Sequence, residues 1–171
     1  NVEKAELFPL EAQEEAMLTK EEVVTPDCKT IADVCAYLKL PVDHSVKAVA
    51  YNSEKGLILC FVRGYHEVNE IKVINTCGVI DLEMATEEQL AAAGTVGGYM
   101  GPVGIDNKKV IVVVDATVMK MHNVCCGANK EGYHFINVNP GRDFIPTYVA
   151  DIRLIQAVSY THLRAHETKA N

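Results

Sequence analysis

Glycine is concentrated in one short stretch of the chain, residues 94–105, whose sequence is GTVGGYMGPVGI. This stretch holds five of the 11 glycines in the whole chain. Backbone without side chains can approach a ligand closely and offers its N–H groups as hydrogen-bond donors. The stretch could therefore form a phosphate cradle, a flexible linker or one wall of a tight pocket.

The residues around these glycines separate the three possibilities. A Walker-type phosphate loop needs Lys and Ser or Thr directly after its glycines, whereas this stretch continues as PVGI. A dinucleotide fingerprint lies between a strand and a helix, whereas this stretch follows a predicted helix and precedes a predicted strand. A flexible linker would be polar, but this one contains Val96, Tyr99, Met100, Val103 and Ile105. The pattern favours a loop whose backbone lies against another surface, with a purely structural helix-to-strand connection as the alternative.

Three polar side chains stand within or at the end of apolar, strand-like segments. Lys47 lies in SVKAVAY, where the alternation of a strand could also turn it to solvent. His134 lies in YHFINVN and could be a hydrogen-bonded core histidine or a ligand-binding group. Asp115 ends KKVIVVVD, where its carboxylate could cap the following turn or bind a ligand. The pattern alone leaves both interpretations open for each residue.

The cysteines predict core packing rather than a metal centre or disulfides. None of them forms a CxxC pair, and most lie among apolar residues: Cys28, Cys35, Cys60, Cys77, Cys125 and Cys126. We expect free, buried thiols. His122 and His134 flank the last two cysteines, so a zinc hydrolase is one alternative, but the paired spacing of zinc ligands is missing. Ser45 and the cysteines lack an evident partner base, so no side-chain nucleophile is predicted.

Three helices are predicted from apolar spacing and capping residues. The first starts at Thr30, a capping residue, and Pro41 ends it. The second covers HEVNEIKVIN, with Val68, Ile71 and Ile74 facing inward. The third, TEEQLAAA, is capped by Thr86 and stops at the first glycine of the glycine-rich stretch.

Strands are predicted over 45–51 and 57–63 as a hairpin, over 79–85, and over 133–139. The continuous β-branched run KKVIVVVD predicts a central strand that is buried on both faces. Hairpins mixed with short helices indicate an α+β fold, a single domain with a mixed, partly barrel-like β-sheet flanked by short helices.

Length and composition set limits on the class of protein. The 171 residues, 49% hydrophobic and 23% charged, are typical of one folded domain. The net charge of −7 argues against a protein that grips nucleic acid by counterion release alone, so a nucleic acid would be held elsewhere or touched at one end. No apolar run is long enough for a membrane helix, and no signal segment opens the chain. We expect a cytoplasmic protein without a membrane partner.

Three segments differ in character along the chain. Residues 1–22 are acidic and predicted to be a connecting arm, and residues 23–157 form the predicted domain. The last residues, 158–171, resemble a translated sequencing adapter and are predicted to carry no function. The chain also lacks an initiator Met, which suggests a piece of a longer protein.

Several blocks together carry a resemblance to a known family. In chain order they are TPDCKTIADV, SVKAVAY, LCFVRGYHEVNEIKV, GYMGPVGI, VVDATV, HNVCCGANKEGYHFINVN and GRDF. From residue 1 to residue 157 the chain resembles the editing insertion of bacterial prolyl-tRNA synthetases, whose fold is shared by freestanding trans-editing deacylases. Many relatives have an aromatic residue at the position of Pro140, which is the one visible departure.

The resemblance implies a set of site residues. It places catalytic roles on Lys47, Asp115, His134 and Gly98. It implies substrate binding by six further residues in the matching blocks: Thr25, Ile31, Val34, Gly101, Pro102 and Gly127. The two residues at positions 31 and 34 match positions that line the alanine pocket of the family.

The implied reaction is hydrolysis of alanine mischarged onto tRNA(Pro), with water attacking the ester and the 2′-OH of the terminal ribose assisting. Lys47 would hold the 3′-terminal phosphate or the ester carbonyl, and N–H groups of residues 98–101 would stabilise the oxyanion. His134 would orient the ester or the 2′-OH, and Asp115 would bind a ribose hydroxyl or the α-amino group. A pocket of alanine size excludes proline by bulk but admits glycine.

The resemblance also implies partners. The domain would meet the 3′ CCA end of aminoacylated tRNA(Pro) and the rest of a homodimeric, class II prolyl-tRNA synthetase. It would need no cofactor, whereas the parent synthetase would use ATP and Mg. Two competing functions stay open from the sequence: a freestanding deacylase for another small mischarged amino acid, and a non-catalytic insertion that braces the synthetase.

Overall fold

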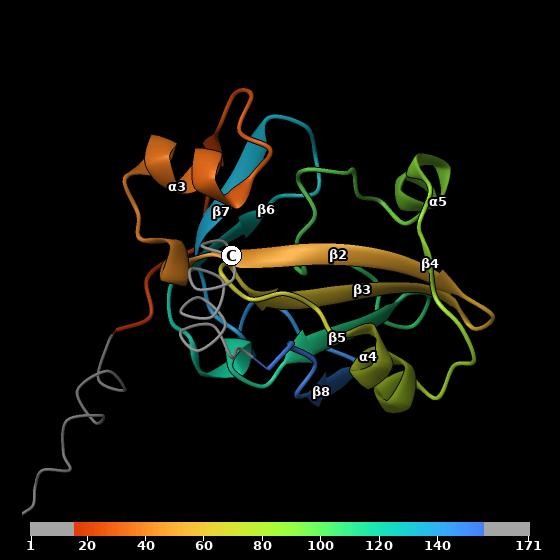
Figure 1. Cartoon of the computed structure of the whole chain (residues 1–171). Helices are drawn as coiled ribbons and strands as arrows, with labels where there is room; N and C mark the ends of the chain where they lie inside the picture. Colours follow the sequence, from red (N-terminus) through yellow and green to blue (C-terminus); the bar gives the residue numbers. More distant parts are fainter. Residues whose placement is uncertain (1–15, 156–171) are drawn as a thin grey trace, which may run out of the picture.

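Two open β-sheets and three short α-helices make up the part of the chain that the computed structural model describes, residues 16–155 (Figure 1). The predicted tail 158–171 lies outside this range, as does most of the predicted arm 1–22. The predicted α+β class with a mixed sheet is confirmed. The description of the sheet as partly barrel-like is not, because the described strands do not close a barrel.

The larger sheet has the strand order β4-β2-β3-β5-β8 and the smaller sheet the order β1-β7-β6. The strands are β1 (Glu21–Val24), β2 (Val46–Ser53), β3 (Gly56–Arg63), β4 (Glu83–Met84), β5 (Ile111–Asp115), β6 (Val124–Gly127), β7 (Tyr133–Val138) and β8 (Tyr148–Ala150). The helices are α3 (Ile31–Leu38), α4 (Glu70–Cys77) and α5 (Glu87–Ala92), with the 3-10 turns η1 (Val42–His44) and η2 (Val118–Lys120). Among the helices of residues 16–155, none has the length and apolar character needed to cross a membrane.

The larger sheet is built around the predicted hairpin and the predicted central strand. β2 and β3 pair antiparallel over their full lengths. β5 lies between β3 and β8 and runs parallel to both. Its residues 112–114 are at most 2% exposed, which confirms the strand buried on both faces. Parallel neighbours on both sides require apolar side chains on both faces, which explains the unbroken valine run.

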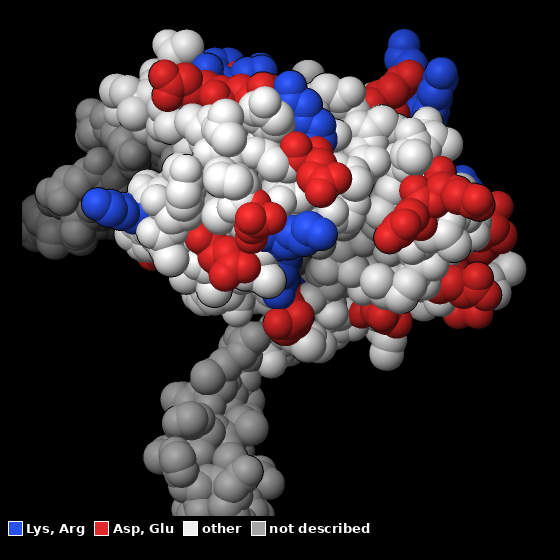
Figure 2. Space-filling model, turned by 90° about the horizontal axis from the view of Figure 1, so that it is seen from above, with Lys and Arg blue, Asp and Glu red and all other residues white. Residues whose placement is uncertain are grey.

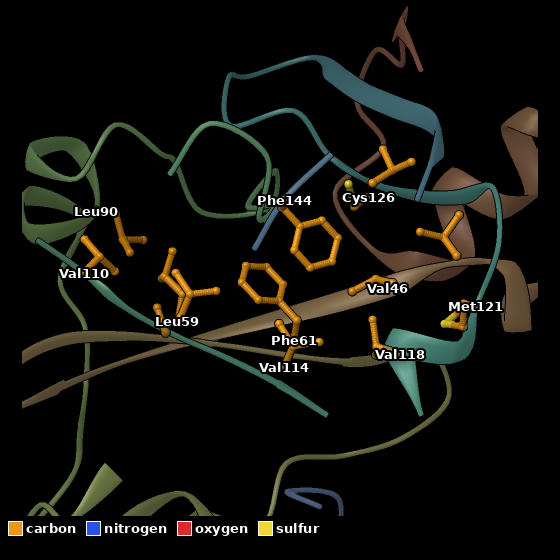
Figure 3. Packing of buried hydrophobic residues seen from close by; sticks show 14 residues of the cluster. Val46, Leu59, Phe61, Leu90, Val110, Val114, Val118, Met121, Cys126 and Phe144 are labelled. Atoms are coloured by element: carbon orange, nitrogen blue, oxygen red, sulfur yellow. The ribbon is translucent and has the colours of Figure 1, made fainter. Parts of the chain in front are cut away.

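The two faces of the larger sheet bury two separate clusters. One face packs against the smaller sheet, and Phe61 and Phe144 meet between the two sheets (Figure 3). The other face packs against α4, whose Val73 and Cys77 are buried. All six cysteines are free and buried, as predicted. Figure 1 shows the resulting layers, with the smaller sheet and α3 on one side of the larger sheet and α4 on the other.

The helix caps agree with the prediction, whereas two helix boundaries differ from it. Thr30 caps α3 and Thr86 caps α5, both as predicted, and Thr86 does so through a capping box with Gln89 that was not predicted. The α3 helix ends with Lys39 in the left-handed conformation, two residues before the predicted stop at Pro41. The helix predicted over 66–75 starts only at Glu70.

The inward face predicted for this second helix was wrong at one residue. Asn69 caps α4 by accepting hydrogen bonds from the N–H groups of Ile71 and Lys72. This cap sets the phase of the helix, so Val73 and Cys77 face the sheet and Ile71 is 69% exposed. The strand predicted over 79–85 is reduced to the two residues of β4, and β1, β6 and β8 were not predicted as strands.

The glycine-rich stretch packs backbone against backbone on β6. A Cβ on Gly101 would overlap the carbonyl oxygen of Gly127, and a Cβ on Gly127 would overlap the carbonyl group of Tyr99. Neither position therefore has room for a side chain. The prediction of a loop whose backbone lies against another surface is confirmed, and that surface is β6.

We expect the replacement Gly101→Ala to lower the free energy of unfolding by about 3 kcal/mol or more, because the new methyl group meets rigid backbone. Gly97→Ala is the matched control. Its Cβ would meet nothing nearer than Leu90 Cδ1 at 3.9 Å, and its φ is not positive. Urea unfolding of both variants checks the prediction, and equal midpoints would contradict it.

Candidate functional site

A cavity of about 530 Å³ opens where α3, the start of β2 and the smaller sheet meet. It brings together six of the ten residues that sequence analysis proposed for the site. These six are Ile31, Val34, Lys47, Gly98, Gly127 and His134. Thr25, Gly101, Pro102 and Asp115 do not line it.

Small and apolar groups form one part of the cavity wall. Ile31 and Val34 come from the first turn of α3, which is fixed by its Thr30 cap. Gly64, at the end of β3, lets Ser45 and Ile31 close in, because a Cβ there would overlap Ser45 Oγ and lie 3.2 Å from Ile31 Cγ2. The glycine at position 64 was missed in the sequence analysis, since nothing in its local pattern indicates this contact.

His134 reaches the cavity from β7 as a neutral imidazole. Its Nδ1 lies 2.6 Å from Thr25 Oγ1, a fully buried hydroxyl, and the ring of Tyr99 stands edge-on to it at 5.4 Å between centroids. Burial lowers the pKa of His134 to about 4. With Nδ1 held by Thr25, Nε2 is the ring nitrogen that remains for a ligand. Thr25 therefore contacts His134 without lining the cavity itself.

Lys47 provides a positive charge at the cavity. Its side chain is 24% exposed, so the predicted alternative of a fully solvent-facing lysine does not describe it. The ammonium lies 3.1 Å from a carboxylate oxygen of Glu67, whose side chain is 65% exposed. An anionic group entering the cavity would compete with this exposed carboxylate for the lysine.

Among the backbone N–H groups of the glycine-rich stretch that make no hydrogen bond within residues 16–155, two belong to residues that line the cavity. These residues are Gly98 and Met100. Gly98 has a φ of +88°, a conformation that favours glycine. Free N–H donors fixed on a loop can stabilise negative charge that develops on an oxygen.

Asn129, in the turn between β6 and β7, holds this loop and was missed in the sequence analysis. Its Oδ1 accepts hydrogen bonds from Thr95 Oγ1 at 2.6 Å and from the Gly101 N–H at 2.8 Å. Its Nδ2 donates to the carbonyl of Val103 at 2.9 Å, and its own N–H donates to the carbonyl of Tyr99 at 2.8 Å. An Asn in the turn ANKEG was the available signal, but turn residues are usually explained by the turn itself.

Asp115 lies outside the cavity lining, at the end of β5, and its carboxylate is fully occupied. It accepts hydrogen bonds from Thr117, from the Ile152 N–H at 2.8 Å and from Arg153 at 2.9 Å. Burial raises the pKa of Asp115, but these hydrogen bonds and the charge of Arg153 outweigh it, so the pKa is below its ordinary value. This geometry corresponds to the turn-capping interpretation.

Gly101 and Pro102 are buried behind the cavity wall, the first against β6 and the second next to a separate hollow near Phe144. Within the described residues, no group of three or more His, Cys, Asp or Glu side chains is placed to hold a metal ion. Of the four residues considered as a zinc set, Cys125, Cys126 and His134 line the cavity. Burial raises the pKa of Cys125 to about 12, which disfavours the thiolate that zinc requires.

Removing the Asn129 side chain should loosen the glycine loop. We expect Asn129→Ala to lower the free energy of unfolding by about 2 kcal/mol, because three side-chain hydrogen bonds are lost. Asn75→Ala, an exposed position on α4, is the control and should change it by less than about 0.5 kcal/mol. Thermal and urea unfolding measure the difference; a loss for Asn129→Ala no larger than for the control would contradict the assigned role.

Burial of a neutral His134 should make stability depend on pH. Its pKa in the folded chain, about 4, is below the ordinary value of 6.5, so the unfolded chain binds more protons between these values. The stability that the folded chain has with a neutral His134 is therefore fully present above pH 6.5. It is lost as the pH falls toward 4. Relative to His134→Gln, the wild type should lose about 3 kcal/mol between pH 7 and pH 4. Parallel stability curves for the two proteins would contradict this.

Comparison with known proteins agrees with the sequence resemblance. The family model described as "Aminoacyl-tRNA editing domain" matches residues 25–144. The proline–tRNA ligase of Heliobacterium modesticaldum is 41% identical over 158 residues, which cover 92% of this chain and 27% of the ligase. The proline–tRNA ligase of Pelobacter propionicus is 42% identical over 160 residues, 92% of this chain and 28% of the ligase. The chain thus spans about a quarter of the length of these relatives.

A solved structure described as a putative trans-editing enzyme for prolyl tRNA synthetase has the same fold. It superposes with a TM-score of 0.66 at 21% identity, covering 80% of this chain and 87% of that one. The family match extends over more than half of the chain and includes the six proposed site residues that line the cavity. The chain therefore belongs to the aminoacyl-tRNA editing domain family, and the predicted identity as an aminoacyl-tRNA deacylase domain is confirmed.

Proposed function

We propose that the chain hydrolyses the ester of tRNA(Pro) mischarged with alanine, as the editing insertion of a proline–tRNA ligase. The observation that carries the proposal is the joint placement, around one small cavity, of two free N–H donors, a lysine and a neutral histidine. The length of the relatives supports the inserted form, because the matching segment is about a quarter of each ligase.

The reaction needs little acid–base chemistry from the protein. Water attacks the carbonyl carbon of the ester, and the carbonyl oxygen carries negative charge in the intermediate. The C–O bond to the ribose then breaks, and the proton lost by the water passes, by way of the neighbouring 2′-OH, to the departing 3′ oxygen. The N–H groups of Gly98 and Met100 donate to this oxygen, and Lys47 adds a positive charge nearby. An imidazole with a pKa of about 4 is a weak base, so His134 serves as a hydrogen-bonding group that orients the ester or the neighbouring 2′-OH. The ribose contact expected for Asp115 would require its carboxylate to leave Arg153.

Selection of alanine follows from the walls of the cavity. Ile31 lies close to Gly64, and Val34 lines the same cavity. With the alanyl methyl group against this wall, the larger ring of proline would force side chains and backbone apart. Overpacking of this kind costs about 1–3 kcal/mol, which corresponds to roughly 5- to 150-fold discrimination. Glycine would still enter the cavity, since a wall that excludes larger groups does not exclude smaller ones.

The surface charges are consistent with contact at the CCA end alone. Figure 2 shows acidic side chains spread over the face on which α3 and α5 lie, with a few basic side chains between them. With a net charge of −7, the chain has no net electrostatic attraction to the phosphates of a long RNA. We infer that other parts of the ligase hold the body of the tRNA and that this chain meets the 3′ end.

Hydrolysis of Ala-tRNA(Pro) and Pro-tRNA(Pro) tests the substrate directly. The chain should release alanine and leave the prolyl ester intact, and Lys47→Ala should lower the rate by about 100-fold through loss of the positive charge. Lys108→Ala, an exposed turn residue, is the control. Release of both amino acids would contradict the selectivity. Release of alanine at equal rates by both variants would contradict the role of Lys47.

The same assay separates the two competing functions. A folded chain that hydrolyses neither ester would favour a non-catalytic insertion that braces the ligase. A chain that releases another small amino acid faster than alanine would favour a deacylase of different specificity.

Gly98→Ala tests the role of the loop. The left-handed backbone and the stem of Lys29, 3.2–3.4 Å from the new Cβ, would shift the N–H groups, so we expect at least a tenfold loss of deacylation with a stability change of about 1 kcal/mol. Gly104→Ala is the matched control, because Gly104 has a similar φ of +83° and open space around its Cβ. Equal activity of the two variants would remove the loop from the mechanism.

A further inference from the structure

A second cavity, of about 630 Å³, lies on the other side of the glycine loop from the first. It is bordered by Glu87 of α5, by the loop residues 95–99 and by Glu131 of the β6–β7 turn. Lys29 and Gly98 line both cavities. The two spaces are therefore neighbours that share a glycine and a lysine in their walls.

Lys29 carries an uncompensated charge at this boundary. Its stem packs on Gly98, since a Cβ there would lie 3.2–3.4 Å from it, while the residue itself is exposed. Lys47 pairs with Glu67 and Lys130 with Glu22, but within residues 16–155 Lys29 has no ion pair. Within this range the ammonium of Lys29 is unpaired, and it lies where the two cavities meet. It could bind a ligand in which an anionic group connects two larger groups, one in each cavity.

A nucleotide chain has this form, because a phosphate joins each pair of nucleosides. This inference rests on the proposed function, which places the aminoacyl ribose in the first cavity. We propose that Lys29 binds a phosphate next to that ribose and that the second cavity holds a nucleobase of the same single-stranded 3′ end. The proposal assigns roles to Lys29, Glu87 and Glu131, which the deacylation mechanism does not use.

The carboxylates define the kind of base. Glu87 and Glu131 are acceptors on the border of the second cavity, and neither makes a salt bridge within the described residues. An exocyclic amino group, as on cytosine N4 or adenine N6, donates to a carboxylate, whereas the O4 of uracil would be repelled by it. The cavity therefore selects an amino-bearing base, either the terminal adenine or the cytosine before it.

The test measures binding of uncharged acceptor-stem RNA to the full chain by fluorescence anisotropy, so it does not depend on hydrolysis. RNA ending in CCA is compared with RNA that has uracil in place of the penultimate cytosine, and with RNA whose terminal adenine lacks its amino group. We expect one of the two changes to weaken binding by about tenfold, and which one does so identifies the base.

The protein variants then locate the contact. In Glu87→Gln and Glu131→Gln the amide can also donate, so the discrimination between bases should shrink to less than about threefold in at least one of them. Glu88→Gln, an exposed neighbour on α5 that does not border the cavity, should keep it. Lys29→Ala should weaken binding of all three RNAs alike and reduce its salt dependence by about one phosphate contact.

Three results would overturn the proposal: no measurable binding of the CCA-ended RNA, equal binding of all three RNAs, or the same loss of discrimination in Glu88→Gln. Base discrimination without deacylation would contradict the proposed function and leave the base site standing. Deacylation without base discrimination would contradict the base site alone.

Discussion

The contact between Gly101 and Gly127 is the constraint on which the site depends. Two backbones can lie this close only without side chains, and the contact presses the glycine loop onto β6. Asn129 then ties the loop from both ends. A loop held by backbone contact and short hydrogen bonds has a fixed backbone. In the proposed function, this keeps the N–H groups of Gly98 and Met100 in place for the ester oxygen.

The electrostatics of the site follow from what is buried and what is exposed. His134 is buried and neutral, Asp115 is committed to Arg153 and the turn after β5, and the thiols at the cavity have raised pKa values. Lys47 lies partly exposed, beside the exposed carboxylate of Glu67. The site therefore resembles a shaped, positively charged cavity with hydrogen-bond donors more than an acid–base pair, which suits an ester that is already activated for hydrolysis.

Elements with a strong local pattern could be predicted from the sequence, and those set by tertiary contacts could not. The β2–β3 hairpin, the valine run of β5 and the capped helix α3 all follow from residues close together in the chain. The exposure of Ile71 depends on the Asn69 cap, which shifts the helix phase. For the site, the residue pattern left both a structural and a functional interpretation open for Lys47 and His134. Their functional interpretation came from the family resemblance. The roles of Gly64 and Asn129 were missed because both rest on residues distant in sequence.

The central claim is that the N–H groups of Gly98 and Met100 contact the reacting ester. The most direct measurement is an NMR titration of the amide-labelled chain with a stable analogue, adenosine carrying alanine through an amide at the 3′ position. The account predicts that these two N–H signals shift together with those of Lys47 and His134, and that the prolyl analogue leaves them unchanged. Shifts confined to residues outside the first cavity, or the same shifts with both analogues, would contradict it.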